Sequence, residues 1–205
     1  LFKIIPTYLT EPKTGKLRIV ADVDSATVFL DGLIIGQTQK DKPTTFKSIE
    51  PGTHILNVKY NKYAPIRNST IKIDAGKIQS FAFSYYDWLK KQKEWLGEPF
   101  DPQKINILVA DFTNATGEVD EVGKQWAFKT YNELSQFLLE DPKLNDVVEI
   151  KRLYSDKTGK FIRDKEQAKN IGNDLSADVV LWGQNTCIGD SICFYSQAYL
   201  NHDSH

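Results

Sequence analysis

The sequence predicts two domains: an all-β sandwich, followed by an α/β domain with a mixed sheet and two helices. In the first part, apolar and polar residues alternate in short segments separated by turn residues. In the second, continuous apolar segments alternate with segments whose apolar residues recur at helical spacing. We therefore expect an N-terminal extension at residues 1–15, the sandwich at 16–86, a helical connector at 87–102 and the α/β domain at 103–205.

The composition is that of an ordinary globular protein. Of 205 residues, 40% are hydrophobic and 26% are charged, which argues against wholesale disorder. No apolar run approaches the roughly 18–20 residues that span a bilayer. The first residue is Leu, so we expect a mature product or a piece of a longer protein, and a membrane anchor in that parent is compatible with the sequence.

Charge is divided unevenly along the chain. Residues 1–86 hold 12 Lys and Arg against 7 Asp and Glu, whereas residues 87–205 hold 14 against 20. The basic residues of the first part are scattered, and nucleic-acid binding needs a concentrated stripe that contacts phosphates. The sequence therefore indicates no nucleic-acid partner.

Turn signals and alternation define the strands of the first domain. An Asp31-Gly32 pair lies between two apolar runs and predicts a two-residue hairpin turn. About seven short strands follow from the whole pattern, and we expect an antiparallel sandwich. The inward sets are Leu17, Ile19, Ala21 and Val23 in one strand, and His54, Leu56, Val58 and Tyr60 in another. With no second His or Cys in this domain to complete a metal site, we expect His54 to be a core or strand-end residue.

Residues 16–85 resemble the PEGA domain. The similarity is carried, in the family's order and spacing, by Val28-Phe29-Leu30-Asp31-Gly32, Gly36-Gln37-Thr38, Ile49-Glu50-Pro51-Gly52-Thr53-His54 and Tyr63. Where the family has Pro-Glu-Gly-Ala, this chain has Glu50-Pro51-Gly52-Thr53. The resemblance implies a sandwich that serves as an accessory module in envelope or signalling proteins and carries no catalytic set.

A short helix is predicted between the two domains, at residues 87–96. Asp87 is a suitable N-cap, Trp88 and Trp95 fall on one face, and Gly97 ends the helix. Two tryptophans on so short a helix indicate contacts between domains, and the helix would fix their relative orientation.

The second domain has the element order β-α-β-α-β-β. Residues 104–112 form a nearly continuous apolar run, typical of a buried strand. A long amphipathic helix then ends near Asp141-Pro142, and a turn is expected at residues 157–159. The remaining elements are a helix at 163–175 and strands at 147–153, 178–183 and 192–200.

Two segments of this domain resemble TolB amino-terminal domains and CsgG-like envelope proteins. They are the run from Ile107 to Gly117, which reads ILVADFTNATG, and the run from Ala177 to Gln184, which reads ADVVLWGQ. The similarity spans residues 104–200. It implies an assembly and partner-binding module, and no functional residues carry over because the matching positions are strand core and a turn.

The sequence offers little support for catalysis, a cofactor or a metal site. The loop after the first apolar strand lacks the glycine pattern of a phosphate-binding loop. Cys187 follows a strand as a peptidase nucleophile does, but no His lies between residues 55 and 201. Cys187 and Cys193 bracket a predicted turn between the last two strands. We expect them to form a disulfide rather than two separate buried thiols, which would indicate an oxidising compartment.

The sequence thus predicts a non-catalytic protein-interaction or assembly module of a larger bacterial envelope or signalling protein. Its expected location is the periplasmic or extracellular side of the envelope. The alternative is a module that binds cell-wall glycan through Tyr60, Tyr63, Tyr85 and Tyr86, the clustered aromatic residues available for ligand contact. A hydrolytic enzyme is the third hypothesis.

Overall fold

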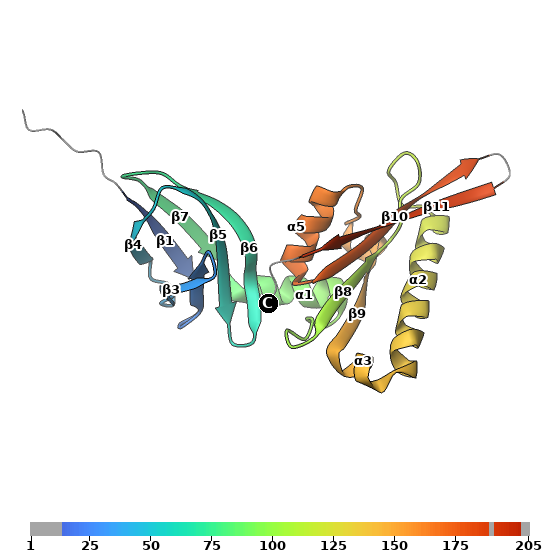
Figure 1. Ribbon diagram of the computed structural model, residues 1–205, viewed down its shortest axis with the longest axis horizontal. Helices are drawn as coiled ribbons and strands as arrows, with labels where there is room; N and C mark the ends of the chain where they lie inside the picture. The colour runs from blue at the N-terminus through green and yellow to red at the C-terminus, as the bar shows by residue number, and fades with distance from the viewer. Residues whose placement is uncertain (1–13, 189–190, 202–205) are drawn as a thin grey trace, which may run out of the picture.

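The computed structural model describes residues 14–188 and 191–201 and shows a mixed α/β protein (Figure 1). Three sheets and five helices lie in this part of the chain. We call residues 14–84, which contain strands but no helix, the β-rich region, and residues 105–201 the α/β region. The predicted N-terminal extension lies almost entirely outside the described residues. None of the helices described is both long and apolar enough to cross a membrane.

The β-rich region consists of two sheets that share one hydrophobic core. The strand orders are β4-β1-β7 and β3-β2-β5-β6. The predicted inward residues Leu17, Ile19, Ala21 and Val23 are all buried, and Leu56 and Val58 of the second sheet are fully buried. The strands are β1 (Gly15–Ala21), β2 (Thr27–Leu30), β3 (Leu33–Gln37), β4 (Thr44–Ile49), β5 (Gly52–Tyr60), β6 (Tyr63–Ile73) and β7 (Ile78–Phe83).

The turns of this region follow the sequence, but one strand pairing does not. The hairpin turn between β2 and β3 is confirmed, with φ values of 52° at Asp31 and 80° at Gly32. β1 and β7, however, pair in parallel, so the expectation of a wholly antiparallel arrangement is wrong. Alternation of apolar residues indicates which face of a strand is buried but says nothing about the direction of its neighbour.

Helix α1 (Tyr85–Leu96) leads from the β-rich region to the α/β region. It begins two residues before the predicted start, because Ser84 rather than Asp87 is the N-cap, and the Ser84 hydroxyl accepts a hydrogen bond from Asp87 N at 3.0 Å. Asp22 of the β-rich region accepts hydrogen bonds from Ser84 Oγ at 2.6 Å and from Tyr85 N at 2.7 Å. The first turn of α1 is therefore fixed to the end of the β-rich region.

The α/β region contains one mixed sheet with the strand order β11-β10-β8-β9. β8, β9 and β10 are parallel, and β11 is antiparallel to β10. The two faces of β8 pack against different helices: Leu108 and Ala110 lie in a core with α1 and α5, and Val109 lies in a core with α2. This burial on both faces explains the continuous apolar run predicted as a buried strand. The elements are β8 (Ile105–Ala110), α2 (Glu121–Glu140), α3 (Pro142–Val147), β9 (Val148–Leu153), α4 (Ser155–Thr158), α5 (Lys165–Leu175), β10 (Val179–Ile188) and β11 (Ser191–Leu200).

Two short helices were not predicted. α2 ends before Asp141, as expected, but α3 starts directly afterwards because the Asp141 carboxylate accepts from Lys143 N and Leu144 N. Pro142 at the first helical position suits such a start. α4 occupies part of the turn predicted at residues 157–159 and ends at Gly159, where φ is 64°.

Candidate functional site: a basic cleft beside the contacts that join the two regions

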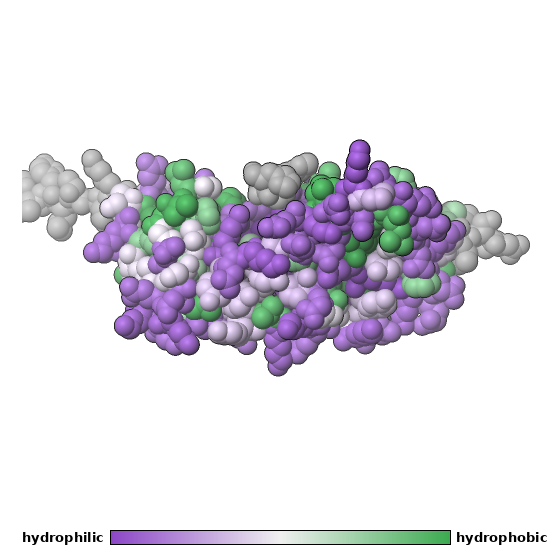
Figure 2. Space-filling view, turned by 90° about the horizontal axis from the view of Figure 1, so that it is seen from below, coloured by the Kyte–Doolittle hydropathy of each residue, from purple (hydrophilic) through white to green (hydrophobic). Residues whose placement is uncertain are grey.

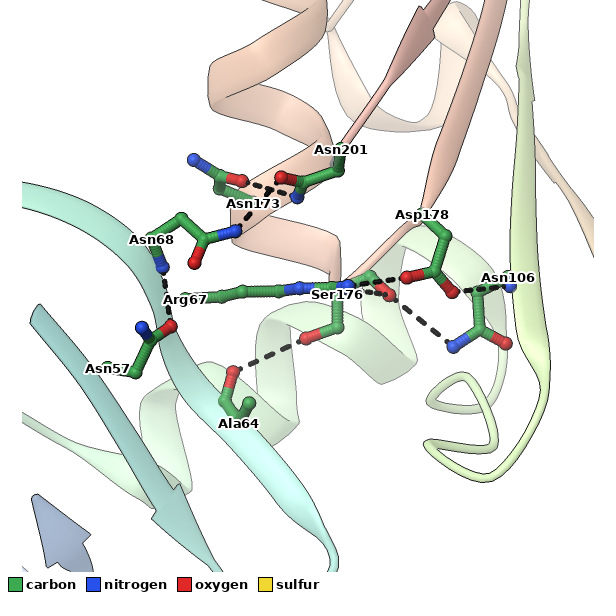
Figure 3. A network of polar contacts seen from close by, with 9 residues as sticks. All are labelled: Asn57, Ala64, Arg67, Asn68, Asn106, Asn173, Ser176, Asp178 and Asn201. Carbon is green, nitrogen blue, oxygen red and sulfur yellow. Dashed lines mark hydrogen bonds and ion pairs between the residues drawn. The ribbon is translucent and has the colours of Figure 1, made fainter. Parts of the chain in front are cut away.

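Arg67 of β6 makes polar contacts that join the two regions (Figure 3). It pairs with the carboxylate of Asp178 and donates to the carbonyl of Ser176 at 3.1 Å. The other carboxylate oxygen of Asp178 accepts from Asn106 N at 2.8 Å. The Arg67 and Asp178 side chains are only 12% and 13% exposed, so both charges depend on these partners.

Three asparagines form a second contact beside this ion pair (Figure 3). Asn68 Nδ2 donates to Asn201 Oδ1 at 2.9 Å, and Asn201 Nδ2 donates to Asn173 Oδ1 at 2.8 Å. A bulge in β6 presents Arg67 and Asn68, because both residues lie opposite the single residue Asn57 of β5. Asn57 Oδ1 accepts from Asn68 N at 2.7 Å, and this bond holds the bulge.

Helix α1 supplies a third set of contacts at the end of α5. Trp88 Nε1 and Gln92 Nε2 donate to the Asp174 carbonyl at 3.1 and 2.8 Å. Lys91 pairs with the Asp174 carboxylate. A helix C-terminus leaves carbonyl groups unpaired and carries partial negative charge, so these donors and cations are suited to it. We call all the contacts of β6 and α1 with residues 173–178 and 201 the joint.

A cleft of about 440 Å³ opens beside the joint. It lies between the turn that connects β5 to β6 and the segment before β8, which face each other at the lower edge of the molecule (Figure 1). Seen from below, this face is mostly hydrophilic, and hydrophobic residues reach the surface in separate small areas rather than in one band (Figure 2). Its lining includes Phe29, Tyr63 and Trp88 from the first part of the chain and Phe100 from the second.

The cleft is basic. Lys59, Lys62, Arg67 and Lys104 line it, and among its described lining residues Asp178 alone carries a carboxylate. That carboxylate is already paired with Arg67. The Nζ atoms of Lys59 and Lys62 lie 5.4 Å from the ring centroids of Phe29 and Tyr63, respectively. The cleft therefore favours a ligand with negative charge.

Two hydrogen-bond acceptors that line the cleft have no partner. Gln92 Oε1 and Asn106 Oδ1 are buried and accept no hydrogen bond from any described residue. An unpaired buried carbonyl costs about 1–3 kcal/mol, so a ligand or water that donates to it would be stabilised there. The arrangement combines cations with acceptors, which suits a ligand that carries both negative charge and N–H or O–H groups.

The predicted tyrosines lie together, but mainly as a packing cluster around the start of α1. The ring of Tyr85 lies 4.7 Å from Tyr60 and 5.7 Å from Tyr86, and Tyr63 lies 5.5 Å from Trp88. Tyr85 is buried, and burial together with the neighbouring tyrosines raises its pKa. Tyr86, at 59% exposure, is the most open of the four, and Tyr60 and Tyr63 are half-buried. Tyr63 is the member of this set that also lines the cleft.

The two predicted tryptophans contact different cores. Trp88 belongs to the core of the β-rich region, and Trp95 packs against the core formed by α5 and the α/β sheet. Lys91 Nζ lies 4.6 Å from the centroid of the Trp95 ring. Helix α1 is thus packed on both sides.

The predicted Cys187–Cys193 disulfide is not found. Cys193 carries a free thiol, and the side chain of Cys187 lies outside the described residues. The β10–β11 register places Cys193 opposite Thr186 and Cys187 opposite Ile192. The two cysteines are therefore not directly opposite each other but offset by one residue in the ladder.

A second polar cluster lies at the carboxyl ends of β8 and β9, where α/β sheets often bind ligands. Asp111, 1% exposed, accepts from Arg152 Nη2 at 2.7 Å and from the backbone N and Oγ of Ser155 at 2.9 and 2.8 Å. Arg152 Nη2 also donates to the Lys124 carbonyl at 2.7 Å. Because these contacts occupy the Asp111 carboxylate, the cluster holds the ends of the strands together. The described residues contain no group of three or more His, Cys, Asp or Glu placed to hold a metal ion.

Sequence reasoning did not identify Arg67, Asp178, Asn68 or Gln92. Their partners lie 82 to 133 residues away in the chain, and no local pattern marks such contacts. The one available signal was the interruption of apolar alternation at Arg67-Asn68, where the bulge occurs.

Comparison with known proteins identifies one part of the chain. Residues 14–84 match the PEGA domain family. No match supports the resemblance of residues 104–200 to TolB amino-terminal or CsgG-like domains. No curated protein and no solved structure matches the chain. The β-rich region, with its two sheets around one core and its Asp31-Gly32 hairpin, is a PEGA domain.

Proposed function

We propose that this chain is a non-catalytic protein-binding module, and that the cleft beside the joint binds an acidic segment of its partner. In this proposal residues 16–86 are a PEGA sandwich domain and residues 103–205 are an α/β domain. The segment 87–102, with α1, connects them. The core of the β-rich region is separate from the two cores of the α/β region, and this separation supports the division.

The excess of cations in the cleft carries the proposal. Two of them, Lys59 and Lys62, are exposed and have no carboxylate partner among the described residues, so they are available to a ligand. A polypeptide segment with Asp or Glu side chains would supply negative charge. Its backbone N–H groups would supply donors for the unpaired oxygens of Gln92 and Asn106.

The glycan alternative has less support. Sugar-binding sites usually offer open aromatic faces, whereas each of the four tyrosines has a ring contact with another of them or with Trp88. Location in the envelope stays a prediction, because the disulfide that favoured it is not found.

The experiment measures binding of fluorescein-labelled 12-residue peptides rich in Asp and Glu by fluorescence anisotropy. The test variant is Lys59→Glu/Lys62→Glu, and the control is Lys40→Glu/Lys42→Glu, which makes the same change of charge at exposed positions outside the cleft. We expect the test variant to bind about tenfold more weakly or worse, a change of about 1.4 kcal/mol or more, and the control to bind almost normally.

Equal weakening in both variants would mean that only the net charge matters, and the cleft would be rejected as the site. Saturable binding of a neutral cell-wall oligosaccharide, lost in Tyr63→Ala, would replace the proposal by the glycan alternative.

A further inference from the structure

Strand β11 forms an open edge of the α/β sheet. It is the last strand in the order β11-β10-β8-β9, and no strand of the described chain pairs with its outer side. Its ladder with β10 runs without a shift through ten residue pairs, from Val179↔Leu200 to Ile188↔Ser191. β10 pairs with β8 over residues 179–181 and with Thr113 at Gln184, and the end of the β10–β11 hairpin beyond these contacts extends past the sheet (Figure 1).

The sequence of β11, SICFYSQAYL, contains no charged residue and no proline. Natural proteins protect long edge strands with Lys, Pro, bulges or a covering element, because unpaired backbone groups otherwise bind another strand. None of the first three devices occurs in β11. Four of its exposed side chains are small or uncharged, namely Tyr195, Ser196, Gln197 and Ala198.

Other edges of the protein are protected. β9, at the opposite end of the same sheet, carries Glu149 and Lys151, which form an ion pair at 3.0 Å. β6 contains Pro65 and a bulge, and it packs against α5. In the β-rich region, β3 lies beside β4 and β7 lies beside β6.

We propose that β11 pairs antiparallel with β11 of a second copy of this chain and joins two four-stranded sheets into one. Strand addition needs a partner segment that is extended, free of bulges and electrically compatible with the edge. β11 is itself such a segment. Antiparallel pairing about a two-fold axis places each strand against its own sequence, and a strand without charge then brings no like charges together. Because the β9 edge is charged, the assembly closes at two copies.

Salt distinguishes this association from binding in the cleft. The pairing strand β11 carries no charge and the full chain has a net charge of only −1, so salt should change the dimer affinity little. Salt weakens binding of an acidic peptide to the basic cleft, because it screens attraction between opposite charges.

The test is sedimentation equilibrium of the full chain from micromolar to submillimolar concentration, at low and at high salt. The test variant is Ser196→Lys/Ala198→Lys, which places cations on the exposed edge. The control is Asn132→Lys/Gln136→Lys on the exposed side of α2. We expect a monomer–dimer equilibrium that the edge variant weakens by about tenfold or more and that the control leaves unchanged.

Hydrogen exchange provides a measurement that needs no variant. Amides of residues 191–200 should become more protected as the concentration of the unmodified protein rises. A monomer at every concentration, or a dimer that the edge lysines do not weaken, would overturn the proposal. The edge variant should bind acidic peptides normally, so failure of this proposal is distinguishable from failure of the cleft.

Discussion

Replacing Arg67 by Ala removes the guanidinium that connects β6 to the end of α5. The change deletes a hydrogen bond to the Ser176 carbonyl and the ion pair with Asp178. The Asp178 carboxylate keeps its hydrogen bond from the N–H of Asn106, so it loses only part of its polar contacts.

The expected loss of stability follows from these contacts. A hydrogen bond to a charged group contributes about 1.5–3 kcal/mol, and one to a neutral carbonyl contributes about 0.5–1.5 kcal/mol. Breaking a fully buried pair costs about 3–5 kcal/mol, but both side chains here retain some contact with water. We therefore expect Arg67→Ala to lower the free energy of unfolding by about 2–3 kcal/mol.

Urea unfolding followed by two probes measures this effect. Three of the four tryptophans, Trp95, Trp126 and Trp182, pack in the cores of the α/β region, and only Trp88 packs in the core of the β-rich region. Fluorescence is therefore weighted toward the α/β region, whereas far-UV circular dichroism reports on the whole chain. In the unaltered protein the two transitions should coincide. In Arg67→Ala they should separate, because the joint loses its contacts to Ser176 and Asp178 and couples the two regions less strongly.

The matched control is Arg18→Ala, which removes an exposed guanidinium from β1 and should change stability by less than about 0.5 kcal/mol. A double-mutant cycle with Asp178→Asn isolates the pair, and we expect a coupling of about 1 kcal/mol or more. The reasoning is refuted if Arg67→Ala matches the Arg18 control and the coupling is absent.

Three further predictions concern other parts of the molecule. His54 Nδ1 lies 2.6 Å from the Asp31 carboxylate, and this bond raises the pKa of His54 and lowers the pKa of Asp31. The pair therefore stabilises the fold in full between about pH 3.8 and 6.5. This contribution amounts to about 0.5–1 kcal/mol because Asp31 is half exposed. It is lost as pH falls through the lowered pKa of Asp31 or rises through the raised pKa of His54. Thermal melts across pH should show higher stability in this pH range, and Asp31→Asn should abolish that difference. Gly123→Ala should destabilise the protein by about 1–3 kcal/mol in urea, since its Cβ would lie 2.1 Å from the Phe112 carbonyl oxygen. Asn132→Ala, at an exposed position of the same helix, introduces no such clash and should not destabilise the protein. Unreduced native protein should react with a thiol reagent at Cys193, and a mass two hydrogens lower than that of the reduced chain would contradict the observed register.

The sequence predicted the positions of the strands and helices better than it predicted which strands pair with one another. Period-two alternation identified the buried residues of β1, and Asp31-Gly32 identified a turn, because both depend on neighbouring residues. The parallel pairing of β1 with β7 depends on how distant segments meet, and alternation carries no such information. The same limit explains the cysteines, whose one-residue offset is set by the register of β10 and β11.

The cleft could not be predicted for a similar reason. Lys59 and Lys62 were visible only as scattered basic residues, and Lys104 as the start of an apolar strand. They become one basic site because α1 and the joint bring the turn between β5 and β6 close to the segment before β8. Trp88 and Trp95 did indicate a helix between two cores, but not the surface that it creates.

The most direct test of the cleft is an NMR titration of the labelled full chain with an acidic peptide. The account predicts saturable shifts in backbone amides of residues 59–64 and 103–106, with the same dissociation constant at both segments, and no shifts along residues 195–200. Shifts spread evenly over exposed lysines, or saturable shifts confined to a surface away from these two segments, would contradict it.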